Sequence, residues 1–321
     1  MKIHLPNSAF LGNINPFLRS FDTSSPNTLE ITANKKWISV HPVVLCMVGA
    51  LGVSKEPSKI NFEKVEAASK HYLERMGLFG IMGIKSKIKI KEHEPAGRFI
   101  PLTKITNSEQ LSKFITEMVP LLHLDTTQAD PIKYVVSELV RNVLEHAQAP
   151  NGAIVCAQYY QKSNSIRIGV VDTGVGIKKT ITQSHPAHTN LEAIRLALMP
   201  GVTGTTFREG GTEYNAGAGL FFIKSIAKVN RDFFVIYSGN AMYKLLKHTQ
   251  GKKEIMLYGD PFKDRHTAEE DFPNWQGTAV GIDISLNATK EFSLLLELIR
   301  KTYTQTVRER RKERYRRARF I

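Results

Sequence analysis

The sequence predicts an α/β protein in which a smaller α/β domain precedes a larger one. A chain of 321 residues is long enough for two hydrophobic cores, and 42% hydrophobic with 23% charged residues is typical of a globular protein. Residues 134–147 place apolar side chains at helical spacing, whereas residues 153–160 and 165–171 form two neighbouring strand-like runs. Helices and strands are therefore expected together in the larger domain.

The first part of the chain is predicted to hold an irregular arm, residues 1–27, and then the smaller domain, residues 28–102. The arm carries Asn-Pro and Ser-Pro pairs, which are typical of turns. In the domain, Pro42 suits the first position of a helix, and the apolar run after it is typical of a buried helix. We expect two strands, this helix, an amphipathic helix and a solvent-facing strand, over residues 28–32, 36–40, 42–53, 62–76 and 85–91.

The larger domain is predicted over residues 103–290, followed by a helix with a basic tail over residues 291–321. The pair Asp130-Pro131 is predicted to open the central helix of this domain. The two strand-like runs after that helix are expected to pair antiparallel. Further helices are predicted over residues 108–122, 190–199 and 292–302, and further strands over residues 232–237, 253–257 and 279–285.

Charge and cysteine content limit the classes of partner and compartment. The net charge is +14, and +6 of it lies in the last 14 residues, which hold eight basic and two acidic side chains. This tail is either a solvated helical extension or a site for nucleic acid or an acidic partner. Cys46 and Cys156 lie in apolar contexts, which favours two buried free thiols over a single disulfide.

The sequence predicts no membrane segment. The longest apolar run, residues 43–53, is too short to span a bilayer and contains two glycines. Residues 1–20 mix Asn, Pro and Gly through their apolar positions, unlike a signal peptide. We therefore expect a cytoplasmic protein without a membrane partner.

The central helix carries a polar stripe beside its apolar face. Glu138, Asn142 and His146 are four residues apart, so at 3.6 residues per turn they lie nearly in line. An Asn side chain can offer a neutral oxygen to Mg²⁺, and a Glu one turn away can polarise a water molecule. The alternative is an ordinary amphipathic helix with a solvated polar face. We assign His146 a supporting role at most.

Three glycine-rich segments follow the central helix. Asp172-Thr-Gly-Val-Gly ends the second strand-like run, Gly217-Ala-Gly-Leu leads into an apolar helical run, and Gly277-Thr278 opens a late strand. Glycines at a helix start expose amide groups that favour phosphate. Taken alone, the first segment is typical of a plain turn and the second of a helix cap.

The Glu138 to Asn142 pair and the three glycine-rich segments, in this order, resemble the four motifs of the GHKL ATPase superfamily, which includes gyrase B and the sensor histidine kinases. The resemblance covers about residues 105–290. It implies a Bergerat-type α/β sandwich, in which a mixed, mostly antiparallel sheet lies under helices. It also implies ATP and Mg²⁺ as ligands, and an ATP lid over residues 178–216.

By this resemblance each motif residue has a role at the nucleotide. Glu138 would be the catalytic residue, and Asn142 would bind ATP and ligate Mg²⁺. Asp172 would accept a hydrogen bond from the adenine amino group. The remaining ATP-binding residues would be Gly174 and Gly176, where the backbone approaches the base, Thr278 on the other side of the adenine, and Gly217, Gly219 and Leu220 at the phosphates.

The resemblance implies a Mg-ATP-binding protein that hydrolyses ATP or transfers its phosphate to a protein Ser or Thr, with lid closure switching a partner or the N-terminal domain. The alternative is a non-catalytic, nucleotide-gated binding module whose basic tail holds nucleic acid or an acidic partner. A homodimer is expected by analogy alone. The smaller domain is distantly similar to STAS-type regulatory domains, and His71 does not match the phosphoacceptor hairpin of a sensor kinase.

Overall fold

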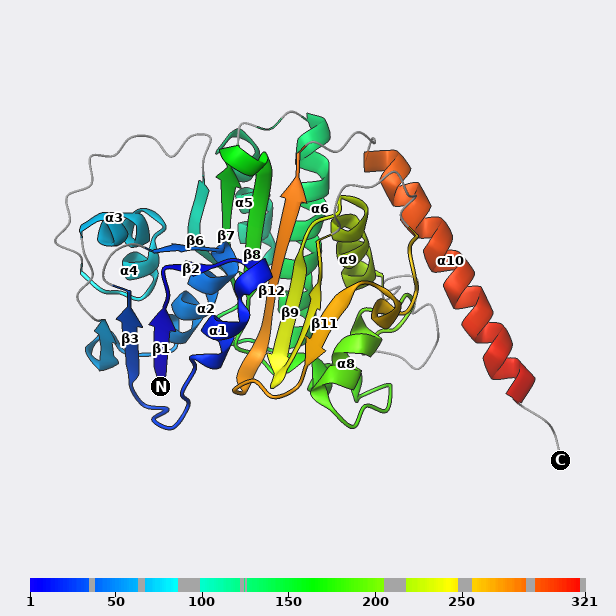
Figure 1. Cartoon of the computed structure of the whole chain (residues 1–321), viewed down its shortest axis with the longest axis horizontal. Coiled ribbons are helices and arrows are strands. Elements are labelled where there is room, and N and C mark those ends of the chain that lie inside the picture. The colour runs from blue at the N-terminus through cyan, green and yellow to red at the C-terminus, as the bar shows by residue number, and fades with distance from the viewer. Residues whose placement is uncertain are drawn as a thin grey trace.

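The computed structural model describes residues 1–34, 38–62, 67–85, 99–121, 124, 126–204, 218–247, 256–286 and 292–317. A seven-stranded sheet forms its centre (Figure 1). The strands are β6 Phe99–Ile105, β7 Ala153–Tyr160, β8 Ser165–Val171, β9 Phe234–Gly239, β10 Ala241–Leu245, β11 His266–Glu269 and β12 Trp275–Ser285. They follow the order β11-β10-β9-β12-β8-β7-β6, and all pairings of this sheet among the described residues are antiparallel. The predicted α/β class with a largely antiparallel sheet is confirmed.

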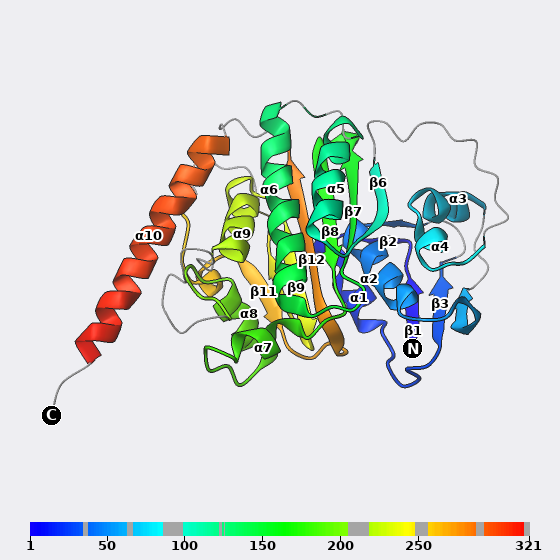
Figure 2. The same ribbon diagram turned by 180° about the vertical axis from the view of Figure 1, so that it is seen from behind.

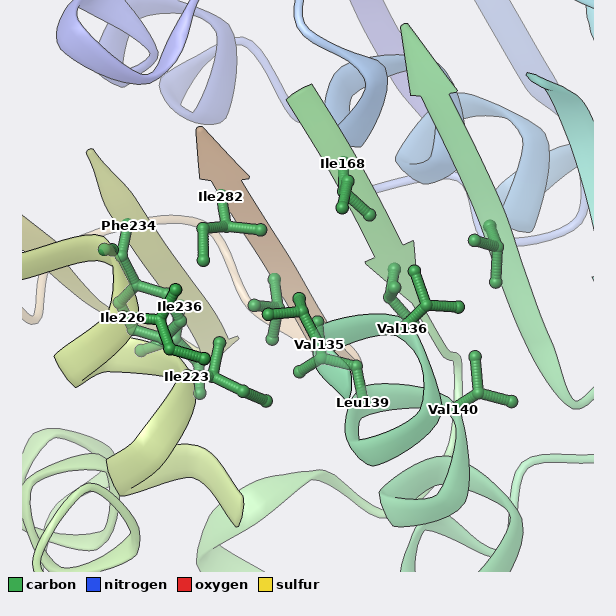
Figure 3. Close-up of a cluster of buried hydrophobic side chains, with 14 of the residues drawn as sticks. Val135, Val136, Leu139, Val140, Ile168, Ile223, Ile226, Phe234, Ile236 and Ile282 are labelled. Carbon is green, nitrogen blue, oxygen red and sulfur yellow. The ribbon is translucent and has the colours of Figure 1, made fainter. Parts of the chain in front are cut away.

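Three helices cover one face of this sheet, as Figure 2 shows: α5 Ser108–Leu121, α6 Thr126–Asn142 and α9 Gly219–Val229. The apolar stripe of α6 lies against the middle strands, and α9 packs beside it (Figure 3). Each fully buried Val, Ile or Leu contributes roughly 1.5–3 kcal/mol through the loss of water contact. The side chains at this interface include Val135, Val136, Leu139, Val140, Ile168, Ile223, Ile226, Phe234, Ile236 and Ile282.

One long helix, α2 Pro42–Val53, covers the opposite face of the sheet and contacts β6, β7, β8 and β12. His41 caps it, because its Nδ1 accepts a hydrogen bond of 3.1 Å from the Val43 amide, and Pro42 is its first residue, as predicted. Gly169 allows the close approach: a Cβ there would lie 2.4 Å from the backbone of Val43. Because α2 lies between the sheet and further N-terminal elements, it is buried on nearly all sides.

We call residues 1–34, 38–62 and 67–85 the N-terminal layer. Besides α2 it contains a parallel three-stranded sheet, in the order β1-β3-β5, and a short parallel pair, β2 with β4. The bounds of its elements are β1 Lys2–Leu5, β2 Ser8–Ala9, α1 Asn15–Arg19, β3 Leu29–Ala33, β4 Ser39–Val40, β5 Ile60–Phe62, α3 Ala67–Arg75 and α4 Leu78–Ile81.

Residues 1–27 are not the irregular arm that the sequence predicts. Strand β1 pairs with β3, and the side chains of Phe17 and Leu18 are buried in the core under the sheet. Arg19 pairs with Asp271 at 3.0 Å and with Glu269 at 2.8 Å. The predicted domain boundary between residues 102 and 103 also falls inside β6, so both predicted domains contribute to one sheet.

The C-terminal helix, α10 Phe292–Arg317, runs along α9 and contacts α6. The Tyr303 ring lies against Phe221 and Phe222, with ring centroids 6.4 and 6.2 Å apart. The far end of α10 extends away from the rest of the molecule (Figure 1). The helix therefore continues into the basic tail, as predicted. Of the helices in the described ranges, none is both long and apolar enough to cross a membrane.

Several predicted elements differ from the observed ones. Helix α6 begins at Thr126, so Pro131 lies inside it and does not open it. The predicted helix over residues 62–76 is shorter, because Phe62 ends β5 and α3 begins at Ala67. Strands β10 and β11 were not predicted. The predicted strand over 253–257 has only residues 256 and 257 in the described chain, where they form no strand, and 86–91 of the strand over 85–91 lie outside it. Both cysteines are buried and free, as predicted.

Candidate nucleotide-binding site

A cavity of about 390 Å³ opens between α6, the start of α9 and the ends of β8 and β12. Two further helices close its far side, α7 Gly176–Ile181 and α8 Asn190–Ala197. The volume falls in the range of small-molecule sites, and the lining combines apolar side chains with a few polar ones. The predicted site residues that line the cavity are Glu138, Asn142, Asp172, Gly176, Gly219, Leu220 and Thr278.

Asp172 lies at the end of β8 and is only 2% exposed. Its Oδ1 accepts a hydrogen bond of 2.7 Å from the Gly174 amide, and its own amide donates to the Thr278 carbonyl at 2.9 Å. Burial raises the pKa of Asp172 from 3.8 to about 7, although the hydrogen bonds from Gly174 and Thr278 oppose this shift. The site therefore holds a buried carboxyl group that needs a hydrogen-bond donor to be stable in its ionised form.

Gly174 and Gly176, the two glycines after Asp172, occupy backbone positions that a larger residue would not fit. A Cβ on Gly174 would lie 2.0 Å from the Ala147 carbonyl oxygen, which accepts a hydrogen bond from the Val175 amide at 2.8 Å. Gly176 has a φ of +78°, a left-handed conformation that favours glycine. Gly176 lines the cavity, whereas the close neighbour of Gly174 is the end of the central helix.

The central helix ends in a π-helical turn, Val143–Ala147. Such a turn widens the helix by one residue per turn and occurs often at functional sites. It places His146 and Ala147 on the cavity wall together with Asn142 and Glu138. His146 Nε2 lies 3.8 Å from the Glu145 carboxylate, which is compatible with the supporting role predicted for it.

Glu138 and the first residue of α9 lie directly opposite each other. A Cβ on Gly219 would be 2.7 Å from Glu138 Oε2, so only glycine leaves this carboxylate its place. Burial raises the pKa of Glu138, whereas Arg141, 3.3 Å away, lowers it. A raised pKa brings a carboxylate closer to the range of a general base that works near neutral pH.

The start of α9 is suited to bind an anion. The first amides of this 11-residue helix have no partner within the helix, and the helix dipole favours negative charge at this end. Ala218, Gly219 and Leu220 line the cavity at this point. Gly217, also predicted to bind phosphate, lies outside the described residues, as do residues 205–216 of the predicted lid.

The Asn142 side chain could ligate a metal ion whose other coordination positions are filled by phosphate oxygens. Its Nδ2 is buried and has no hydrogen-bond partner among the described residues, so the amide group is free to turn toward a ligand. Within the same described ranges, no cluster of three or more His, Cys, Asp or Glu side chains could hold a metal ion. Mg²⁺ commonly takes one or two protein oxygens and fills its shell with phosphates and water. The residues present therefore fit Mg²⁺ bound together with a nucleotide.

Three further site residues escaped prediction, and they come from distant parts of the chain. Trp275 Nε1 donates to the Asp172 carbonyl at 3.2 Å, and Gln276 Nε2 donates to the Gly174 carbonyl at 2.5 Å. Ser238 Oγ donates to the Gly277 carbonyl at 2.6 Å and accepts from the Ile177 amide at 3.0 Å. The pair Gly277-Thr278 was the only local signal near them, and it marks the strand but not its neighbours.

The cavity thus lies between an antiparallel sheet and the helices on one of its faces, and both a buried carboxyl group and a helix start line it. Residues 100–230 match the family model of the histidine kinase-like ATPase domain. This part of the chain is therefore similar to histidine kinase-like ATPase domains, which supports the GHKL resemblance. None of the curated proteins compared with the chain matches it. The match leaves out the N-terminal layer, so its distant likeness to STAS-type domains stays a prediction.

Proposed function

We propose that the cavity binds Mg-ATP and that Asp172 recognises the adenine. The observation that carries this proposal is that the buried Asp172 carboxyl group and the start of α9 line the same cavity. A buried carboxylate accepts hydrogen bonds and cannot donate them once ionised. The 6-amino group of adenine would supply a further donor to the Asp172 carboxylate, while the amides of α9 suit the phosphates.

For the reaction we propose that Glu138 acts as the general base. It would take a proton from water, which gives ADP and phosphate, or from a Ser or Thr hydroxyl of a protein, which gives ADP and a phosphoprotein. Its carboxylate lies beside the first amide of α9, where the terminal phosphate would be held. Asn142 would hold Mg²⁺, which neutralises phosphate charge when it is bound. Lid closure would then switch a protein partner or the N-terminal layer.

A second function, the nucleotide-gated binding module, is favoured by the position of α10. Its Tyr303 packs on Phe221 and Phe222, which directly follow the cavity residues Gly219 and Leu220 in α9. Movement at the phosphate end of the cavity would therefore reach α10 and its basic tail. In this case ATP is a ligand without turnover, and the tail holds nucleic acid or an acidic partner.

Calorimetry with Mg-ATP tests the proposed function, with phosphate release followed in parallel. We expect wild type to bind ATP, Asp172→Asn to lose detectable binding, and Glu138→Gln to bind like wild type with phosphate release about 10²–10⁴-fold slower. Asp232→Asn is the matched control, since Asp232 is also buried but bonds to Ser285 away from the cavity. Failure of wild type to bind millimolar ATP would refute the proposal, and equal phosphate release by wild type and Glu138→Gln would favour the binding module.

A further inference from the structure

We propose that Trp275 is a positioning residue for the Asp172 carboxylate, and that Phe21 of the N-terminal layer holds Trp275 in place. The inference rests on the proposed function, because Asp172 is taken as the residue that recognises adenine. It adds a role for the N-terminal layer, which the family match does not cover. In this view the adenine pocket is incomplete without residues from the opposite face of the sheet.

Strand β12 holds the backbone of Asp172 from both sides. The Thr278 carbonyl accepts a hydrogen bond from the Asp172 amide at 2.9 Å, and the Trp275 indole donates to the Asp172 carbonyl at 3.2 Å. Between these two contacts the register of β12 with β9 shifts, so Gln276 and Gly277 form an irregularity in the strand. A bulge of this kind re-aims a strand locally and is common next to functional sites.

The contact between the bulge and the Asp172 turn leaves no free space. Gly277 has a φ of +104°, and a Cβ there would lie 2.3 Å from the Asp172 carbonyl oxygen and 2.7 Å from its Oδ1. Gln276 also donates to the Gly174 carbonyl, and the Gly174 amide donates to Asp172 Oδ1. The carboxylate is thus oriented by a turn whose backbone is fixed by β12.

Trp275 connects this turn to the N-terminal layer. It is 4% exposed and belongs to the core between the N-terminal layer and the face of the sheet that α2 covers. Its ring meets Phe21 edge-on at a centroid distance of 5.8 Å, and Phe21 meets Phe17 at 5.2 Å. The neighbouring Arg19 is held by ion pairs to Glu269 at the end of β11 and to Asp271 just after it. Phe21 therefore packs against the indole from a position that is itself held.

The indole N–H is the only polar group of the Trp275 side chain. The effect of its hydrogen bond can therefore be separated from the packing effect of the ring. Trp275→Phe keeps an aromatic ring in the core but leaves the Asp172 carbonyl without this donor. Loss of one such hydrogen bond changes an equilibrium by about 1 kcal/mol, or roughly fivefold. The loss should fall on ATP alone, because inosine triphosphate carries an oxygen in place of the adenine amino group and gains nothing from a well-placed carboxylate.

The test compares Trp275→Phe and Phe21→Leu with the control Phe62→Leu. Phe62 is a partly buried aromatic residue of the same core. Its ring meets Phe79 edge-on at a centroid distance of 5.1 Å and lies away from Trp275. We expect the two test variants to bind ATP about three- to tenfold more weakly, with the affinity for inosine triphosphate unchanged. The control should bind both nucleotides like wild type. Equal weakening of both nucleotides, or no weakening of ATP, would overturn the inference.

Amide hydrogen exchange gives a readout that does not depend on ATP binding. The Gly174 amide, which donates to the Asp172 carboxylate, should exchange several-fold faster in Trp275→Phe and Phe21→Leu than in wild type and in Phe62→Leu. Unchanged exchange at Gly174 would refute the positioning role. If wild type binds no ATP but exchange responds as expected, the proposed function fails while the positioning role stands.

Discussion

Replacing Asp172 by Asn should stabilise the empty protein while it removes ATP binding. In the folded state the pKa of Asp172 is about 7, against 3.8 for the exposed group, so the folded chain holds this proton more tightly than the unfolded chain. The contribution of Asp172 to the free energy of unfolding is therefore fully present below about pH 4 and is lost as the pH rises to about 7. At about 1.4 kcal/mol per pH unit, the loss of this contribution amounts to about 4 kcal/mol at pH 8, where the folded-state carboxyl group is ionised, and to about 2 kcal/mol at pH 5, where it is protonated only on folding.

Asn keeps the shape of Asp and can still accept the hydrogen bond from the Gly174 amide, but it carries no charge. The free energy of unfolding of Asp172→Asn, measured by urea titration without nucleotide, should thus exceed that of wild type by up to about 4 kcal/mol at pH 8 and by about half as much at pH 5. A variant no more stable than wild type at pH 8, or a gain that does not shrink at pH 5, would refute this reasoning. Asp232→Asn should gain less, because the pKa of Asp232 is raised only to about 6.

Three further predictions concern other parts of the molecule. Burial lowers the pKa of His41, so wild-type stability should fall as the pH drops below about 6.5, and urea titrations of His41→Gln should show a weaker dependence in this range. Asp264 is the carboxylate partner of two buried lysines in α9, so Asp264→Asn should lower the free energy of unfolding by about 3–5 kcal/mol. Gly219→Ala places a methyl group against the Glu138 carboxylate and would displace it. Phosphate release should therefore fall at least about tenfold, while the free energy of unfolding measured by urea titration stays as in wild type.

Each of these variants has a matched control. His4→Gln, which changes a histidine at an exposed strand position, is the control for His41→Gln. Asp271→Asn removes an exposed ion pair with Arg19 and should leave the free energy of unfolding close to that of wild type. Gly80→Ala adds a Cβ that meets no atom within 4 Å and should leave phosphate release at the wild-type rate. Test variants that behave like their controls would contradict the corresponding prediction.

The sequence predicts those features of the site that depend on neighbours in the chain. Glu138 and Asn142 share a wall of the cavity because both lie on one helix, and helical spacing is readable locally. The apolar face of α6 was predicted for the same reason, and the buried side chains of Val135 and Leu139 confirm it. The start of the same helix was placed too late, because Asp130-Pro131 is a strong local start signal, whereas Pro131 is the sixth residue of the observed helix.

Features that depend on distant segments could not be predicted. The dipeptides in residues 1–27 are turn signals, but parallel pairing of β1 with β3 buries the segment. Strand β10 lacks alternation because all five residues are buried, including Lys244, whose Nζ donates to Asn15 at 2.7 Å. The burial of Asp172 likewise depends on β12, about a hundred residues further along the chain.

The alternation of side chains along β12 explains how one strand serves both faces of the sheet. Trp275 and Ala279 belong to the core shared with the N-terminal layer, whereas Thr278 and Val280 line the cavity on the opposite face. Cores are packed as tightly as organic crystals, so a displacement of β12 cannot be absorbed by empty space on either side. A nucleotide that shifts Thr278 therefore changes the contacts of Trp275 as well. The proposed ATP binding would thereby couple the N-terminal layer to the cavity through the sheet itself, independently of any movement of the lid.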